Sequence, residues 1–221
     1  MDIIILADGN FPTAEYPLEL LHNADILICC DAAVLKLHSR KPDYIVGDMD
    51  TLPEDEKAKY KDIIIKSSCQ ETNDQTKAFS FALGLVSEGK TANIHILGAT
   101  GGREDHTLGN LSLLMEYTKN DGCPIPPFNN IMHKGINVEI VTDHGIFTPH
   151  YNTFTAESYP GQQISIISFD KNLRIRSKGL AYPTDDAIFE FWWRGTLNEA
   201  LDCSFTLEFS HSAPVMLFKK F

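Results

Sequence analysis

Residues 94–111 read IHILGATGGREDHTLGNL, and this stretch carries the pattern that decides the fold. It begins with a short run, Ile94–Leu97, of the kind that forms a strand buried on both faces. A glycine-rich turn follows, and then apolar residues at helical spacing predict a helix over Thr107–Thr118. A strand, a turn and a helix in this order predict one unit of a parallel sheet.

The same alternation of strand and helix extends over residues 1–143 and predicts an α/β domain with a parallel sheet and helices on both faces. The expected strands are Ile3–Leu6, Ile26–Cys30, Tyr44–Val46, Ile63–Ile65, Ile94–Leu97 and Val138–Val141. The other expected helices are Leu18–Asn23, Ala33–Ser39, Pro53–Tyr60 and Asp74–Ser87. Three prolines and a glycine in Asn120–Asn130 predict a long surface loop before the last of these strands.

Residues 144–221 have a different pattern and form the second expected domain. Apolar and polar residues alternate in Leu173–Arg176 and in Ser204–Ser210, and no helical period occurs. Ile188–Trp193 and Val215–Phe218 are further expected strands. Alternation of this kind means strands with one wet face, so we expect a C-terminal antiparallel β-sandwich.

Composition excludes several classes of protein. The chain has 221 residues, of which 43% are hydrophobic and 22% charged, which is typical of a folded globular protein. A net charge of −11 argues against binding to nucleic acid, and no apolar run is long enough to span a membrane. The five cysteines are odd in number and form no CxxC pair, which favours a reducing compartment, the cytoplasm.

Acidic residues follow nearly every expected parallel strand. In an open α/β sheet these turns share the edge at which such folds bind ligands. Carboxylates gathered there repel one another unless a cation is present, and Mg²⁺ joins carboxylates to phosphate oxygens. The acids in question are Asp8, Asp31, Asp48, Asp50, Glu71, Asp74, Glu104 and Asp105.

Each of these features also has a plainer explanation. Asp48 and Asp50 reach one metal only if their turn bends, and Asp74 taken alone is better explained as a helix cap. Gly101 and Gly102 suit a backbone nest for phosphate, with Arg103 as its charged partner, but an ordinary turn with a surface arginine has the same residues. His106 is better explained as a structural residue on the first helical turn than as a catalytic partner of Asp105. Neither a Walker A loop nor a GxGxxG fingerprint is present.

Four segments, in order along the chain, resemble the thiamin pyrophosphokinase family. Residues 30–33, CDAA, are similar to its CADGG segment, and residues 42–51, PDYIVGDMDT, to P-x-x-x-x-G-D-[FM]-D-S. Residues 70–78, QETNDQTKA, resemble DQ-D-x-T-D-x-x-K-A. Residues 98–110, GATGGREDHTLGN, match G-x-x-G-G-R-x-D-H-x-L-x-N almost throughout.

The C-terminal half resembles the same family in two shorter segments. Residues 179–183, GLAYP, are similar to GLKYPL or GLKW. Residues 195–199, GTLNE, resemble [GT]-x-S-N-E, with Leu197 at the position of a small hydroxyl residue.

The resemblance implies an α/β domain, a β-sandwich and a homodimer in which thiamin lies between the α/β domain of one subunit and the sandwich of the other. It implies transfer of the diphosphoryl group of ATP to the hydroxyl of thiamin. Mg²⁺ is expected on Asp48, Asp50 and Asp74, with Asp31 supporting them. The polyphosphate is expected on Gln70, Lys77, Gly101, Gly102 and Arg103, while Asp105 either orients Arg103 or joins the acids. Thiamin is expected to contact Tyr182, Trp192 or Trp193, Thr196 and Asn198.

Two alternatives remain at this point. The chain could diphosphorylate another small alcohol, such as a pterin carbinol, which Leu197 and the missing glycines after Asp31 motivate. It could also be a sensor that binds thiamin or a nucleotide without turnover, although such a sensor has no need of the metal-binding acids.

Overall fold

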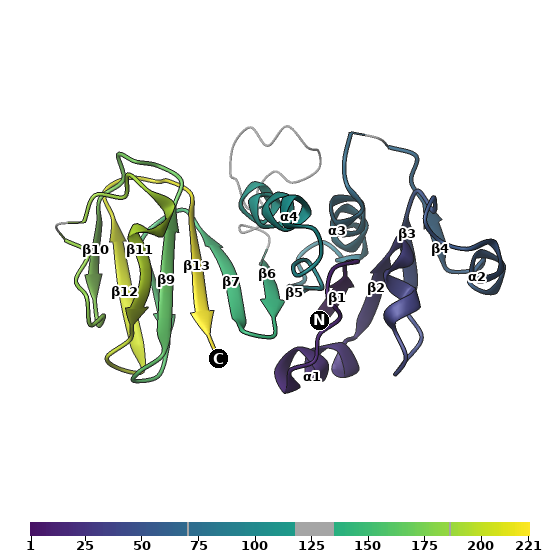
Figure 1. Cartoon of the computed structure of the whole chain (residues 1–221), viewed down its shortest axis with the longest axis horizontal. Helices are drawn as coiled ribbons and strands as arrows, with labels where there is room; N and C mark the ends of the chain where they lie inside the picture. Colours follow the sequence, from purple (N-terminus) through teal and green to yellow (C-terminus); the bar gives the residue numbers. More distant parts are fainter. Residues whose placement is uncertain (70, 118–134, 186) are drawn as a thin grey trace. The chain divides into compact units, whose positions relative to one another are not determined.

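The structure is a computed structural model that describes residues 1–69, 71–117, 135–185 and 187–221. The chain separates into two compact units, unit 1 (Met1–Asp143) and unit 2 (His144–Phe221), drawn in Figure 1. The expected loop Asn120–Asn130 lies outside the described residues. Within the described ranges, no helix is both long and apolar enough to cross a membrane.

Unit 1 is built on a parallel sheet of six strands. Their order is β6-β5-β1-β2-β3-β4, and every neighbouring pair is parallel. All six expected strands are present, so the prediction of a parallel α/β domain is confirmed. The strands are β1 (Asp2–Leu6), β2 (Ile26–Cys30), β3 (Tyr44–Gly47), β4 (Ile64–Lys66), β5 (Ala92–Leu97) and β6 (Ile136–Thr142).

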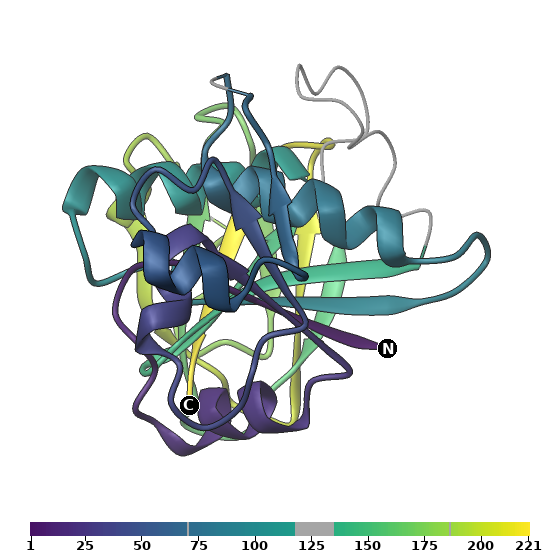
Figure 2. The ribbon, with the colours of Figure 1, turned by 90° about the vertical axis from the view of Figure 1, so that its right-hand side faces the viewer.

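Helices cover both faces of this sheet, which explains why its central strands are apolar on both sides. In Figures 1 and 2, α3 and α4 lie on one side of the sheet and α1 lies on the other. Ile3, Ile4 and Ile5 of the central strand β1 are 0% exposed. The helical elements are α1 (Glu15–Asn23), the 3-10 helix η1 (Asp31–Lys36), α2 (Glu54–Lys59), α3 (Asp74–Leu85) and α4 (Glu104–Tyr117).

The strand order reverses beside β1 and so creates the opening for a site. The chain runs outward from β1 through β2, β3 and β4, and then returns to place β5 on the other side of β1. After β1 the chain continues to α1 and after β5 it continues to α4, and these two helices lie on opposite faces of the sheet (Figures 1 and 2). Open α/β folds bind ligands at such a reversal, outside the carboxyl ends of the strands.

Unit 2 consists of two antiparallel sheets that enclose a common apolar core, as predicted for a β-sandwich. One sheet has the order β11-β9-β13-β7 and the other β10-β12-β8. Ile164 and Val215 from the first sheet pack in one core with Ile175 and Phe205 from the second. The strands are β7 (Gly145–His150), β8 (Phe154–Glu157), β9 (Gln163–Ser168), β10 (Ile175–Lys178), β11 (Gly195–Glu199), β12 (Ser204–Phe209) and β13 (Val215–Lys220).

The expected strand at Ile188–Trp193 is wrong. Residues 187–191 form no strand, and Trp192–Arg194 form a short 3-10 helix, η3. Phe189 is buried as an anchor in the core, whereas Phe191, Trp192 and Trp193 are all exposed, so exposure does not alternate. A run of consecutive aromatic residues has strand-like composition without the two-residue period that a half-buried strand needs.

Buried His150 leads us to expect that the stability of unit 2 depends on pH. Its ring stacks on Phe154 with ring centroids 3.5 Å apart, and burial lowers its pKa to about 4. In the unfolded chain the pKa returns to about 6.5, so the unfolded state binds more protons between these two values. We therefore expect the free energy of unfolding to fall as pH falls through this window, by about 2–3 kcal/mol at about pH 4.5.

Urea unfolding of the wild type and of His150→Gln, at about pH 7.5 and about pH 4.5, measures this contribution. The variant cannot titrate at this position, so its loss of stability between the two pH values is expected to be smaller by that amount. The same loss in both proteins would contradict the assignment to His150.

Candidate active site

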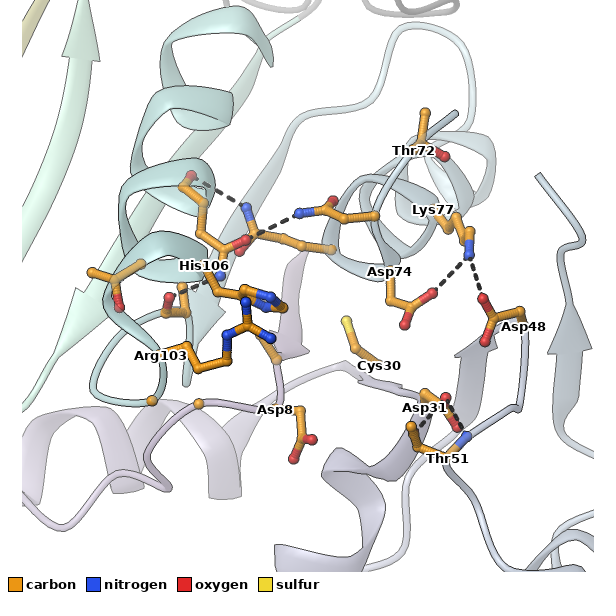
Figure 3. Close-up of a pocket in the computed structure, with 18 residues that line it drawn as sticks. Asp8, Cys30, Asp31, Asp48, Thr51, Thr72, Asp74, Lys77, Arg103 and His106 are labelled. Carbon is orange, nitrogen blue, oxygen red and sulfur yellow. Dashed lines mark hydrogen bonds and ion pairs between the residues drawn. The ribbon is translucent and has the colours of Figure 1, made fainter. Parts of the chain in front are cut away.

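Unit 1 contains a cavity of about 430 Å³ at the carboxyl edge of its sheet (Figure 3). Its walls come from the segments after β1, β2, β3, β4 and β5, from the first turn of α3 and from the first two turns of α4. This is the edge at which the sequence places the acidic turns. The lining residues are Ala7, Asp8, Gly9, Cys30, Asp31, Asp48, Thr51, Thr72, Asn73, Asp74, Gln75, Lys77, Ala99, Gly102, Arg103, His106, Thr107 and Asn110.

One side of the cavity carries three carboxylates, those of Asp31, Asp48 and Asp74. Each offers an oxygen, and these oxygens all lie within 4.8 Å of one another. Asp31 adopts a left-handed backbone conformation with φ +39°, which aspartate tolerates better than most residues. Its Oδ2 accepts a hydrogen bond from Thr51 Oγ1 at 2.7 Å, while its buried Oδ1 has no hydrogen-bond partner among the described residues. The three residues form what we call the acid cluster.

The beginning of α3 frees Asp74 for this cluster. The N-cap of the helix is Asn73, whose side-chain oxygen accepts a hydrogen bond from the backbone N–H of Thr76 at 2.9 Å. Asp74 is the first residue inside the helix, and its carboxylate lines the cavity. The plainer explanation of Asp74 as the helix cap is therefore replaced, because Asn73 performs that task.

Lys77 joins two members of the acid cluster. Its Nζ lies 2.8 Å from Asp74 Oδ1 and 3.4 Å from Asp48 Oδ2 (Figure 3). Burial lowers the pKa of Lys77, but the hydrogen bond to Asp74 and the two negative charges outweigh burial, so the pKa is raised. The backbone N–H of Asp50 and the charge of Lys77 together lower the pKa of Asp48. The carboxylate of Asp48 is therefore ionised at neutral pH.

This donor set fits a hard divalent cation. Mg²⁺ prefers carboxylate oxygens, and no described residue donates to the buried Asp31 Oδ1, a strong acceptor next to two further carboxylates. Asp50, a predicted metal ligand, is exposed and lies outside both this cluster and the cavity lining. Its backbone N–H donates to Asp48 Oδ1 at 3.2 Å. Asp50 as a ligand stays a prediction.

The turns after β1 and β5 interlock on the other side of the cavity. Gly9 N–H donates to the carbonyl of Gly98 at 2.7 Å, and Asn10 N–H donates to that of Thr100 at 2.9 Å. A Cβ atom on Gly9 would lie only 2.3 Å from the carbonyl oxygen of Gly98. Gly101 has φ +82°, a conformation that favours glycine. The glycines therefore permit a close approach of two backbones, and Gly102 lines the cavity.

Arg103 lines the cavity as an exposed arm held by Asp105. The guanidinium Nε lies 3.0 Å from Asp105 Oδ1, and a second hydrogen bond joins Nη2 to Oδ2. The hydrogen bond from Arg103 lowers the pKa of Asp105 to about 2. Asp105 lies outside the cavity lining and the acid cluster. Of the two roles expected for Asp105, the structure favours orientation of Arg103.

Several lining residues have no individual role among the expectations from the sequence. Thr51 and Asn110 are two of them, and Asp8 is expected only as one of the acids at this edge. Asp8 pairs with Lys36, whose Nζ lies 2.7 Å from its Oδ1, and Thr51 binds Asp31. Asn110 donates to the carbonyl of Ala99 at 2.8 Å. Asp8 and Asn110 do have a signal in the sequence, since one follows a strand and the other ends the 98–110 segment. Thr51 likewise ends the 42–51 segment.

The residues expected to contact thiamin lie in unit 2. Tyr182, Trp192 and Trp193 are 66%, 59% and 64% exposed. Thr196 donates its hydroxyl to the carbonyl of Trp193 at 2.7 Å. The side chain of Asn198 is buried and holds the backbone of Tyr182, accepting from its N–H at 3.1 Å and donating to its C=O at 2.7 Å. Gln70, expected on the polyphosphate, lies outside the described residues.

Comparison with known proteins covers most of the chain. Residues 18–125 match the family model described as "Thiamin pyrophosphokinase, catalytic domain". Residues 145–218 match "Thiamin pyrophosphokinase, substrate-binding domain". The two matched ranges fall on opposite sides of the boundary between unit 1 and unit 2.

Named relatives and solved structures agree with these models. Thiamine pyrophosphokinase 1 of Oryza sativa subsp. japonica is 33% identical over 122 residues, covering 50% of this chain and 45% of the relative. Thiamine pyrophosphokinase 2 of Arabidopsis thaliana is 37% identical over 137 residues, covering 52% and 51%. The matches therefore span about half the length of these relatives.

The solved structures show the fold. Thiamine pyrophosphokinase from Bacillus subtilis superposes with a TM-score of 0.74 at 20% identity, covering 100% of this chain and 99% of that one. Thiamin pyrophosphokinase from Candida albicans superposes with a TM-score of 0.73 at 18% identity, covering 99% and 90%.

Proposed function

The chain belongs to the thiamin pyrophosphokinase family, and we propose that it transfers the diphosphoryl group of ATP to the hydroxyl of thiamin. The products are thiamin diphosphate and AMP. A bond forms between the thiamin hydroxyl oxygen and the β-phosphorus of ATP. The bond from that phosphorus to the oxygen of AMP breaks, and the hydroxyl loses its proton.

One observation carries this proposal. One cavity has the acid cluster on one side and, on the other, the turn after β5 (residues 98–102, the glycine turn) with Arg103. Carboxylates without a cation would repel a polyphosphate. A site that bound phosphate through Arg103 alone would have no use for three carboxylates. The pair fits a polyphosphate that arrives with a divalent cation, because the cation satisfies the acids and Arg103 binds phosphate oxygens.

The residues of the cavity act mainly by position and charge. Phosphoryl-type transfer needs the attacking and leaving oxygens held in line, with negative charge neutralised around the phosphorus. Arg103 is exposed and can bind phosphate oxygens, and Asp105 fixes the orientation of its guanidinium. Gly102 lies just before α4, whose N-terminal N–H groups favour an anion.

We assign the cation as Mg²⁺, held by Asp48 and Asp74 with Asp31 as the third carboxylate. When bound, Mg²⁺ neutralises charge on the polyphosphate. Asp50 remains a further predicted ligand on the same turn as Asp48. Lys77 is close enough to the cluster to share its charge with a bound phosphate.

We place thiamin against unit 2 and propose a homodimer. Support comes from the aromatic side chains of Tyr182, Trp192 and Trp193, since a cationic thiazolium ring is attracted to aromatic faces. Exposed apolar groups of this size are also typical of an interface. We propose a cytoplasmic location, because Cys29, Cys30, Cys69 and Cys203 are all free thiols.

An assay of AMP release from ATP and Mg²⁺, with and without thiamin, tests the function. Mass spectrometry of the product identifies thiamin diphosphate. We expect AMP only when thiamin is present, in a one-to-one ratio with that product. AMP release that ignores thiamin but responds to another alcohol, or thiamin binding without any AMP, would contradict the proposal.

A further inference from the structure

Lys77 occupies an unusual place for a lysine. Its side chain is only 5% exposed, although lysine is almost never buried unless it is paired. Its ammonium group reaches Asp74, one turn earlier on α3, and Asp48, in the segment after β3. One cation therefore holds together two carboxylates from separate elements, at the place where the proposed metal binds (Figure 3).

The third carboxylate of the cluster shows that this charge compensation is incomplete. In the part of the chain that the structure describes, Asp31 Oδ1 is buried without a hydrogen-bond partner, while Oδ2 accepts a hydrogen bond from Thr51. Within residues 1–69, 71–117, 135–185 and 187–221, the three carboxylates thus have one ammonium group among them, that of Lys77. The cluster therefore keeps an excess of negative charge, which attracts a further cation. This excess is smaller than the charge of three carboxylates without an ammonium group.

We propose that Lys77 is a resident counter-ion that lowers the affinity of the acid cluster for a free divalent cation. The metal then binds firmly only together with the polyphosphate, whose negative charges offset the ammonium group. This inference rests on the proposed function, because it assigns the acid cluster to a metal that enters with ATP.

Two opposing effects decide the direction of a substitution. Removing the ammonium group removes a like charge a few ångströms from the incoming cation, which strengthens metal binding. It also removes hydrogen bonds that hold Asp48 and Asp74 in place, which weakens binding. Repulsion between close charges in a partly buried site exceeds the net contribution of such hydrogen bonds, so we expect tighter binding.

Titration with Mn²⁺ alone tests this, with free Mn²⁺ measured by electron paramagnetic resonance and no nucleotide or thiamin present. Mn²⁺ takes the same oxygen ligands as Mg²⁺. We expect Lys77→Met to bind Mn²⁺ about tenfold more tightly than the wild type, or more. Lys77→Arg keeps the charge and should stay near the wild type. Lys57→Met, which breaks a surface ion pair with Glu54 on α2, should stay within about twofold.

Addition of a non-hydrolysable ATP analogue extends the test. It should tighten Mn²⁺ binding by a larger factor in the wild type than in Lys77→Met, because the analogue's phosphates remove the repulsion that only the wild type has. Lys77→Gln, which is also uncharged, replaces Lys77→Met if that variant does not fold.

Equal or weaker Mn²⁺ binding by Lys77→Met would overturn the proposal, as would the absence of Mn²⁺ binding from both proteins. Neither result bears on AMP release by the wild type, which tests the proposed function separately. Conversely, if Lys77→Met bound Mn²⁺ more tightly but the wild type released no AMP, the counter-ion role of Lys77 would stand and the proposed diphosphotransferase activity would be wrong.

Discussion

Asp48→Asn should reduce thiamin-dependent AMP release by about 10³-fold while leaving the fold intact. Asp48 lies in the acid cluster, and the substitution removes one of three negative charges. A metal contributes several kcal/mol to stabilising a transition state, and each 1.4 kcal/mol is worth a factor of ten in rate. Asparagine keeps the oxygen that accepts the N–H of Asp50, so the turn is preserved.

The measurement is the rate of AMP release at saturating ATP and thiamin, together with thermal unfolding without metal. Unfolding should change little, because Asp48 is partly exposed, its ion pair with Lys77 is long at 3.4 Å, and the like charges of Asp31 and Asp74 oppose that pair. Asp62→Asn, which removes an exposed carboxylate outside the cavity lining, is the matched control and should retain wild-type activity. Activity of Asp48→Asn within tenfold of the wild type would show that the acid cluster is not the metal site.

Two further variants compare the cluster with the ligands expected from the sequence. Asp31→Asn removes charge from a residue that asparagine can replace in its left-handed conformation, and its loss of activity should match that of Asp48→Asn. Asp50→Asn removes a carboxylate that lies outside the cluster. A loss at Asp50 as large as at Asp31 would mean that the turn brings Asp50 to the metal when substrate binds.

Buried parallel strands were the most predictable part of this fold. Runs such as Ile3–Leu6 and Ile26–Cys30 are apolar without alternation, and only a strand covered on both faces suits them. Their carboxyl ends must share one edge, so the pattern of residues alone was enough to place the acidic turns together. The sequence therefore predicted where the site lies, because in a parallel sheet the turn after every strand lies at the same edge.

Individual ligands were less predictable, because they depend on backbone conformation within the turns. Asp48 and Asp50 are separated by Met49, which has φ +66°. No sequence pattern predicts this left-handed backbone conformation for a methionine. Asp31 likewise follows β2 with φ +39° and joins the cluster through this turn. From the sequence we expected Asp31 only to support the metal ligands. Its spacing from Asp48 and Asp74 along the chain could not show that its carboxylate lies within the acid cluster.

The aromatic-rich residues 189–193 of unit 2 have strand-like composition but form no strand. Trp192 and Trp193 have high strand propensity, yet propensity in strands mostly reflects packing on a half-buried surface. Here Phe189 alone enters the core, and the chain then turns through η3 with its large side chains exposed. Exposed tryptophans are unfavourable for a strand in isolation, and they are consistent with a surface kept for a ligand or a second subunit.

Gly9→Ala should destabilise the protein by about 2–3 kcal/mol and remove most of its activity. The new Cβ would lie 2.3 Å from the carbonyl oxygen of Gly98 and 2.4 Å from that of Thr100. Both are backbone atoms, so no side chain can rotate away, and the turns after β1 and β5 must separate. Overpacking of this kind typically costs about 1–3 kcal/mol. The separation also moves Gly102 and Arg103, which bind the polyphosphate in our proposal.

Urea unfolding at neutral pH measures the stability, and the AMP assay measures the activity. Gly109→Ala is the matched control, because it makes the same chemical change inside α4, where a Cβ meets no atom of the described residues within 4 Å. Alanine is favoured over glycine in a helix interior, so this variant should gain about 0.5–1 kcal/mol. The same substitution thus changes sign between the two positions, because one glycine serves a close approach of two backbones and the other does not. If Gly9→Ala were as stable as the wild type, the close approach of the turns after β1 and β5 would not depend on glycine at position 9, and the reason for this glycine would have to lie elsewhere.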